Sequence, residues 1–226
     1  MNKYNPQIHH RRSIRLKEYD YTRQGVYFVT ICTYRREHLF GEVVDGKMVL
    51  NPFGRVVATY WQRLPRHFPR VQLGAWVVMP NHVHGIIIIT DDGDDDDGGD
   101  ACRGEATPQA SIYAEMRGYA EAPGQTEPGG GCLAPTDGVA TTPHGAPSGS
   151  VGAMVGNVKS TITRRINQMR HTPGAMVWQR NYWERVVRTP EEHARIEDYI
   201  RLNPARWQAD VLHPDAPPNP FNQEDI

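Results

Sequence analysis

Residues 75–89 read AWVVMPNHVHGIIII, two apolar runs that meet at Pro80 and Asn81. The runs predict two consecutive strands of one sheet. The turn between them is expected at Pro80 and Asn81, because proline lacks an N–H donor and asparagine is common in turns. The second strand opens with His82 and His84. Side chains alternate between the faces of a strand, so both imidazoles are expected on one face, one pleat apart.

Two parallel imidazoles on a central strand can bind one metal ion, and the spacing of His82 and His84 suits this role. The alternative is a pair of partly exposed polar residues without a ligand. The metal interpretation requires a third ligand and a reactive group from elsewhere in the chain.

The charge of the chain is distributed unevenly. The 226 residues carry a net charge of -1, but residues 91–150 hold twelve Asp or Glu and two Arg. The remainder therefore has 23 Lys or Arg against 14 Asp or Glu, a net of +9. A basic domain favours polyanions such as nucleic acid. The alternative is that scattered cations only keep the surface solvated.

Residues 91–149 are expected to form a disordered, acidic insert. Twelve Gly and six Pro occur in residues 91–150, with few large apolar side chains. Such a segment cannot bury enough surface to offset its ordering entropy. We therefore expect a single catalytic domain in two pieces, 25–90 and 150–207, preceded by a basic arm at 1–24 and followed by a C-terminal tail at 208–226, which is expected to be extended or loose from His213 onward.

The basic arm is a candidate DNA-binding segment. Its cations Arg11, Arg12, Arg15 and Lys17 are interleaved with tyrosines, a combination that suits phosphate contacts and base stacking. A solvated tail is the alternative.

Cysteine usage and hydropathy bear on the compartment. The three cysteines show no C-x-x-C spacing, which suits a reducing cytoplasm. The polar N-terminus lacks the apolar region of a signal peptide, and the longest apolar run is too short to cross a bilayer. We expect a cytoplasmic protein with no membrane partner.

Hydrophobic periodicity predicts strand, helix, strand, strand, helix, strand, followed by a last helix. The ranges are 26–33, 52–64, 71–79, 82–90, 150–169, 177–187 and 190–202, with a short hairpin at 43–50. This order predicts an α+β fold, a ferredoxin-like antiparallel sheet with helices on one face. The helix at 150–169 has Lys159, Arg164 and Arg165 on its polar side, either a phosphate-binding surface beside the histidines or an ordinary solvated face.

The C-terminal helix offers the missing groups. Thr189, Pro190 and Glu192 form a strong helix start. Tyr199 and Asn203 lie one turn apart on one face. If this face meets the histidines, Asn203 Oδ1 is a third ligand and the Tyr199 hydroxyl lies beside the ion. The alternative is a half-buried core tyrosine and an asparagine that caps the helix.

Four segments together resemble the REP-associated tyrosine transposases, which belong to the single-tyrosine HUH transposases. They are YFVTICT at 27–33, VMPNHVHG at 78–85, NYWERVVR at 181–188 and DYIRLNP at 198–204. The resemblance covers residues 11–90 and 150–207. The acidic insert is a departure, since compact members of this group lack it.

The resemblance implies roles for individual residues. His82, His84 and Asn203 would bind Mg²⁺ or Mn²⁺, and Tyr199 would be the nucleophile. The implied activity is cleavage and rejoining of single-stranded DNA near hairpins through a 5′-phosphotyrosine, by a monomer or homodimer. Two other functions stay open: a DNA-hairpin-binding module without catalysis, and a hydrolase that uses the histidine pair on a small phosphate compound.

Overall fold

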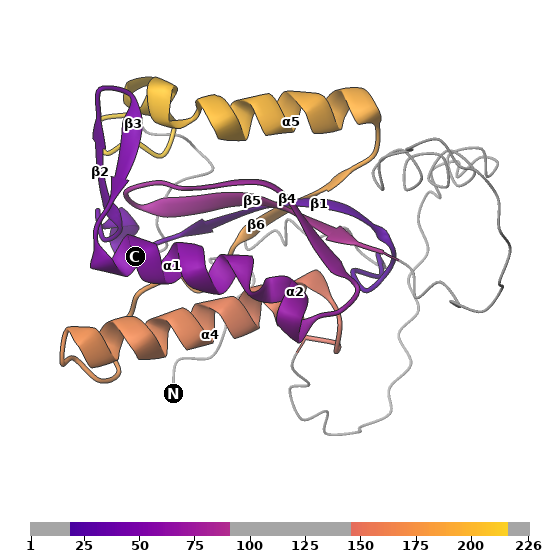
Figure 1. Cartoon of the computed structure of the whole chain (residues 1–226), viewed down its shortest axis with the longest axis horizontal. Coiled ribbons are helices and arrows are strands. Elements are labelled where there is room, and N and C mark those ends of the chain that lie inside the picture. Colours follow the sequence, from indigo (N-terminus) through magenta and orange to yellow (C-terminus); the bar gives the residue numbers. More distant parts are fainter. Residues whose placement is uncertain (1–18, 91–145, 217–226) are drawn as a thin grey trace, which may run out of the picture.

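The structure is a computed structural model that describes residues 19–90 and 146–216. The predicted DNA-binding residues Arg11, Arg12, Arg15 and Lys17 lie outside the described residues, as does nearly all of the predicted insert. The described chain forms a sheet between two helical layers (Figure 1).

Four strands form the central sheet, and each pairs antiparallel with its neighbours. They are β1 (Gly25–Cys32), β4 (Val71–Val78), β5 (His82–Ile89) and β6 (Trp183–Val187). Their spatial order is β4-β5-β1-β6, so the strand that carries both histidines is central. With the helices placed as they are, this order is that of a ferredoxin-like fold, and the predicted fold class is confirmed. A separate hairpin, β2 (Gly41–Val44) and β3 (Lys47–Leu50), lies where the short hairpin was predicted and turns at Asp45 and Gly46.

Side-chain caps mark the starts of the longer helices, including the predicted one at Thr189. Helix α1 (Pro52–Gln62) begins after Asn51, whose Oδ1 accepts from Gly54 N at 2.9 Å. The short α2 (Leu64–His67) follows it. Helix α4 (Val151–Met169) begins after Ser150, and α5 (Pro190–Leu202) after Thr189, whose hydroxyl accepts from Glu192 N. None of the described helices is long and apolar enough to cross a bilayer.

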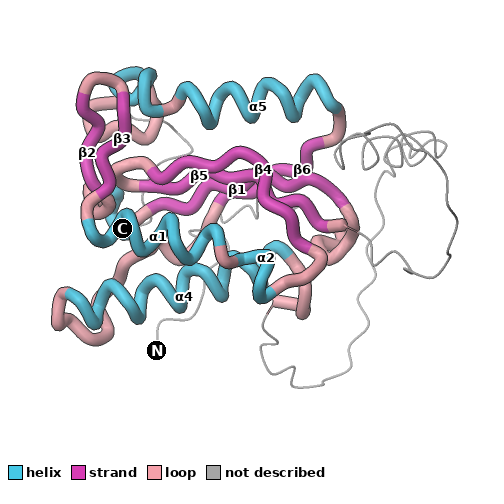
Figure 2. Tube along the Cα trace, in the orientation of Figure 1, coloured by secondary structure: helices cyan, strands magenta, loops and turns pink. Residues whose placement is uncertain are grey.

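The two faces of the sheet bury different cores. Helices α1, α2 and α4 cover one face, and α5 covers the other (Figures 1 and 2). On β5, Val83 and Ile87 pack in the larger core with α1 and α4, whereas Ile86 and Ile88 pack toward α5. His82 and His84 alternate along the strand in step with Ile86 and Ile88, so both side chains lie on the α5 face of the sheet.

Gly85 allows helix α1 to pack closely against strand β5. A Cβ built on Gly85 would lie 2.2 Å from an atom of the Trp61 ring. Trp61 is fully buried, so the ring occupies the space that any side chain at this position would need. The glycine therefore permits close packing of α1 against the strand that carries the histidines.

The last strand is shorter than its apolar run predicts. The predicted strand covered 177–187, but β6 spans Trp183–Val187, and Trp178 makes only an isolated bridge to Thr33. Lys159 Nζ on α4 donates to the carbonyl oxygens of Gln179 and Arg180 at 2.6 and 3.0 Å. These carbonyls bind a side chain in place of a neighbouring strand, so regular pairing starts only at Trp183.

The residues that follow α5 pack against the domain. Helix α5 continues into the 3₁₀ helix η2 (Pro204–Ala209), and the next residues fold back onto the domain. Asp210 and Leu212 are both buried. This segment therefore contributes Asp210 to the face that carries the histidines.

Candidate active site

His82 and His84 lie side by side on β5. Both side chains are buried, and the centroids of their rings are 4.4 Å apart. The strand places them on the face that α5 covers (Figure 1). The sequence prediction of two imidazoles on one face is therefore confirmed.

A second layer of polar contacts orients His82. Its Nδ1 lies 2.8 Å from Asn81 Oδ1, and Asn81 Nδ2 donates to the carbonyl oxygen of Leu212 at 2.8 Å. Asn81 therefore presents its oxygen to the ring, which assigns the proton of His82 to Nδ1. His82 Nε2 is buried and has no hydrogen-bond partner among the described residues.

His84 is oriented by the neighbouring strand. Thr30 stands opposite His84 in the β1–β5 register, and its Oγ1 lies 2.8 Å from His84 Nδ1. The other ring nitrogen, Nε2, lies 3.1 Å from the hydroxyl of Tyr199. With Nδ1 protonated, as in His82, Nε2 accepts a hydrogen bond from the phenol. Metal-binding histidines are commonly held in this way by a partner on the remote nitrogen.

Asn203 and Asp210 complete the cluster from the C-terminal side. Asn203 Nδ2 donates to Asp210 Oδ2 at 2.7 Å, and Asp210 Oδ1 accepts from Leu212 N at 2.6 Å. Asn203 Oδ1 is buried without a hydrogen-bond partner among the described residues. An amide oxygen desolvated in this way is costly unless a ligand binds it.

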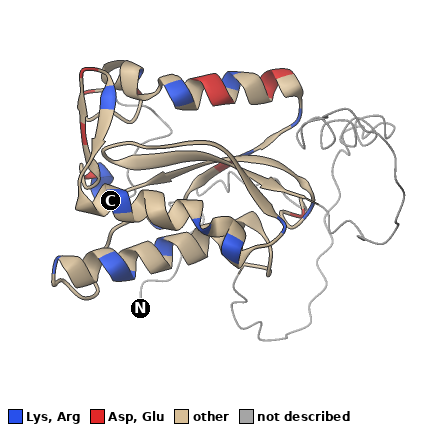
Figure 3. Cartoon of the chain, viewed as in Figure 1, with Lys and Arg blue, Asp and Glu red and all other residues tan. Residues whose placement is uncertain are grey.

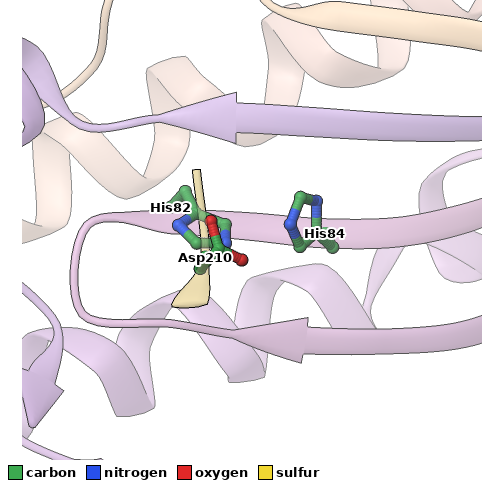
Figure 4. Close-up of side chains that lie close together, drawn as sticks. All are labelled: His82, His84 and Asp210. Carbon is green, nitrogen blue, oxygen red and sulfur yellow. The ribbon is translucent and has the colours of Figure 1, made fainter. Parts of the chain in front are cut away.

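The cluster fits a divalent metal ion. Ligand atoms of His82, His84 and Asp210 lie within 4.8 Å of one another (Figure 4). At this cluster, His82 Nε2 and Asn203 Oδ1 are buried and have no hydrogen-bond partner in the part of the chain that the structure describes. Imidazole nitrogens with amide and carboxylate oxygens are suitable ligands for divalent cations. The donor set thus fits the ion that the histidine spacing predicts.

Burial sets the protonation of these groups. It lowers the pKa of His82 to about 3, and burial together with His82 lowers the pKa of His84 well below its ordinary value. Both imidazoles are therefore neutral at pH 7, the form that binds metal. Burial, and after it the Asp210 carboxylate, raise the pKa of Tyr199 above the ordinary value for a phenol. The phenol therefore needs help to ionise.

Tyr199 is the tyrosine whose hydroxyl reaches the paired histidines. Its side chain is 37% exposed, so its hydroxyl is held at the cluster while the residue remains open to solvent. The ring meets Phe28 edge to face, with centroids 6.2 Å apart. Tyr27, by contrast, is fully buried in the opposite core, where its hydroxyl donates to Arg23 O at 2.8 Å.

The structure brings together four of the residues that the sequence singled out: His82, His84, Tyr199 and Asn203. Asn203 is also the C-cap of α5, so the capping role and the position at the cluster coincide. Asp210, by contrast, was not predicted from the sequence. No periodic pattern relates it to Asn203, because the 3₁₀ turns of η2 intervene.

The expected cations on α4 lie elsewhere. We expected Lys159, Arg164 and Arg165 beside the histidines, and this placement is wrong, because α4 covers the other face of the sheet (Figure 1). The reason is topological: the helix crosses between β5 and β6 on the face of α1. A role of these residues in DNA binding stays a prediction.

Comparison with known proteins finds a relative and related solved structures. No protein-family model matches the chain. A solved structure of a REP-associated tyrosine transposase bound to a REP hairpin is similar with a TM-score of 0.45 and 18% identity, over 85% of this chain and 74% of that one. A Haemophilus influenzae protein described as an uncharacterized protein is 33% identical over 213 residues, which are 94% of this chain and 98% of that protein. Identity of this extent over nearly both whole chains shows that this chain belongs to the same family as the Haemophilus influenzae protein.

Proposed function

We propose that this protein is a single-tyrosine transposase that cleaves and rejoins single-stranded DNA next to a hairpin. The observation that carries the proposal is the 3.1 Å contact between the Tyr199 hydroxyl and His84 Nε2. It joins a partly exposed nucleophile to a buried cluster of metal-ligand atoms. The four sequence segments that resemble the REP-associated tyrosine transposases support the same assignment.

In the proposed reaction, Tyr199 Oη attacks a backbone phosphorus of the DNA. The Oη–P bond forms, the bond from phosphorus to the 3′-oxygen breaks, and the phenolic proton is lost as the 3′-oxygen gains one. The product is a 5′-phosphotyrosine on one fragment and a free 3′-hydroxyl on the other. A later 3′-hydroxyl can reverse the step, because the covalent bond retains the energy of the phosphodiester.

Residues of the chain orient the nucleophile and receive its proton. Without a bound ion, His84 Nε2 holds the Tyr199 hydroxyl, and the Phe28 ring packs perpendicular to the Tyr199 ring. A metal ion on Nε2 would replace the phenol there, and the Phe28 contact would still position the tyrosine. Asp210 Oδ2 lies 3.5 Å from the phenolic oxygen and is positioned to take the proton. Phe28 packs against the His84 ring, and Trp183 packs against Phe28 in turn, so this flank of His84 is apolar.

The metal ion would be held by His82, His84 and Asn203, with Asp210 adjacent. We propose Mg²⁺ or Mn²⁺, which accept such oxygen and nitrogen donors together with phosphate oxygen. When bound, the ion supplies charge neutralisation at the scissile phosphate. The proposed partner is single-stranded DNA that carries a REP-like hairpin.

The test is formation of a covalent adduct. The full chain is incubated with Mn²⁺ and single strands that carry a ten-base-pair hairpin between randomised flanks, labelled at the 3′ end. Because the tyrosine would become linked to the 5′-phosphate of the downstream fragment, the 3′ label should run with the protein on a denaturing gel. A 5′ label should instead appear on a shortened free strand.

Variants decide between the functions that stay open. Tyr199→Phe should abolish the adduct, and Tyr60→Phe, a conservative change on α1 across the sheet, should leave it intact. His82→Ala should reduce it strongly. Hairpin binding without any adduct would instead favour the non-catalytic module. Hydrolysis of a small phosphate ester that survives Tyr199→Phe would favour the hydrolase.

A further inference from the structure

A groove runs along α4 on the face of the sheet away from Tyr199. It lies between α4 and residues 171–182 and has a volume of about 1190 Å³. The wall opposite α4 is the irregular segment that precedes β6. The Lys159 contacts to the carbonyls of Gln179 and Arg180 fix this wall relative to the helix.

The groove is positively charged. Its lining includes Lys159, Arg164, His171 and Arg180, and it contains no Asp or Glu. Helix α4 likewise has no acidic residue, and in Figure 3 its ribbon carries blue segments and no red ones. Arg164 and Arg180 are exposed, and neither guanidinium has a hydrogen-bond or ion-pair partner in the described ranges 19–90 and 146–216. Lys159 is engaged by the wall, so these two arginines are the cations open to a ligand.

Between the cations the lining is mainly apolar. Met176 lies in this lining and is 63% exposed. Gly156 on α4 leaves open space, since a Cβ placed there meets nothing within 4 Å. Apolar surface flanked by unpaired guanidinium groups is the chemistry that binds unstacked bases and their phosphates.

The groove adjoins the candidate active site at one end of the sheet. Gln179 N in the wall donates to Cys32 O at 3.0 Å, and Cys32 is paired with His82 in the β1–β5 register. The wall, β1 and β5 are thus successive neighbours, about 5 Å apart at each step. A strand of a few nucleotides that passes around this end of the sheet reaches from the groove to Tyr199.

We propose that the α4 groove binds the single-stranded DNA that flanks the cleavage position, with Arg164 and Arg180 on phosphates and Met176 against a base. The proposal rests on the proposed transposase function for its substrate. It assigns the flanking strand to a surface separate from the metal-ligand cluster. A second copy of the chain and an acidic peptide are the other occupants that the test distinguishes.

The test measures binding of fluorescein-labelled dT20 to the full chain in EDTA over a range of salt concentrations. Arg164→Ala with Arg180→Ala should weaken binding about tenfold near ~0.1 M salt and reduce the salt slope by about 0.7 for each lost phosphate contact. Met176→Ala should weaken binding without changing the slope. Gly156→Glu, which fills the open space with a carboxylate, should weaken it as well.

The matched control is Arg63→Ala with Arg66→Ala, which removes the same charge from exposed positions at the α1–α2 junction, outside the groove. It should bind dT20 nearly as the unaltered chain does. Equal losses in both double variants would overturn the proposal, because they indicate only net charge. If the groove variants have a lower mass in sedimentation than the unaltered chain but bind dT20 equally well, the groove is the binding site for a second copy of the chain. Tight binding of poly-glutamate that dT20 cannot displace would assign it to an acidic peptide.

The two proposals fail separately. If the adduct with Tyr199 forms but the groove variants bind dT20 normally, the transposase function stands and the groove assignment is wrong. If the groove variants lose dT20 binding but no adduct forms, the groove stands as a nucleic-acid site and the cleavage function is wrong.

Discussion

Asn203 Nδ2 donates to Asp210 Oδ2 across 2.7 Å, and this contact joins the end of α5 to the segment that follows η2. The amide is thereby oriented with Oδ1 on the other side, buried and without a partner among the described residues. One carboxylate thus fixes the orientation of the candidate metal ligand and also lies 3.5 Å from the candidate nucleophile.

Replacing this carboxylate should weaken metal binding. In Asp210→Asn the charge beside the cluster is lost and the contact that orients Asn203 is altered, so affinity for Mn²⁺ should fall by about 10- to 100-fold. Calorimetric titration with Mn²⁺ measures the change. Asp215→Asn is the matched control, because its carboxylate is 91% exposed. Equal affinities of the two variants for Mn²⁺ would mean that Asp210 has no part in the site.

Thr30 should matter through His84 alone. Thr30→Val keeps the shape of the side chain but removes the hydroxyl that lies 2.8 Å from His84 Nδ1. The imidazole then loses its orienting partner, and we expect Mn²⁺ affinity and adduct formation to fall by about tenfold or more. The same change at Thr59, on α1, serves as the control. A Thr30 variant that matches the Thr59 variant in both measurements would show that the hydroxyl does not orient the ring.

The sequence predicted the parts of the fold that rest on local patterns. The alternation from His82 to Ile89 gave the correct faces, and the start signal at Thr189 gave the correct beginning of α5. Spacing along α5 gave the correct pairing of Tyr199 with Asn203. These features depend on residues a few positions apart, where periodicity is informative.

Tertiary contacts decided the features that the sequence analysis missed. Apolar residues at 177–182 suggested a strand, but Lys159, from another element, binds the carbonyls that a strand would pair. Asp210 enters the site because η2 reverses the chain, and no spacing rule relates it to Asn203. The cations of α4 are evident in the sequence. Their position on the face opposite the histidines, however, depends on the side of the sheet on which the connection after β5 crosses.

Gly85 should be intolerant of even a methyl group. A Cβ there lies 2.2 Å from the Trp61 ring, which is fully buried and cannot move away freely, so Gly85→Ala should lower the free energy of unfolding by about 1–3 kcal/mol. Gly156→Ala is the control in open space within a helix and should raise it by up to about 1 kcal/mol. Urea denaturation compares the two. If both variants gained stability, the close packing of Trp61 on this strand would be wrong.

The metal-free protein should lose stability in mild acid through His82. Burial lowers the pKa of His82 to about 3 in the folded chain, whereas an unfolded histidine titrates near ~6.5. When the pH falls below the pKa of the unfolded histidine, the unfolded state binds a proton that the folded state does not. The free energy of unfolding therefore declines until the pH reaches the pKa of His82 in the folded chain. Between about pH 7.5 and pH 5 this linkage costs about 2 kcal/mol.

Urea denaturation in EDTA at these two pH values measures the effect, and His82→Gln identifies its source. The glutamine does not titrate, so the loss of stability between the two pH values should be smaller in the variant by about 2 kcal/mol. His84, whose pKa is also lowered by burial, remains in the variant and leaves a residual decline. An unchanged decline in His82→Gln would show that His82 takes up its proton equally in the folded and unfolded chains, and would contradict its burial in this site.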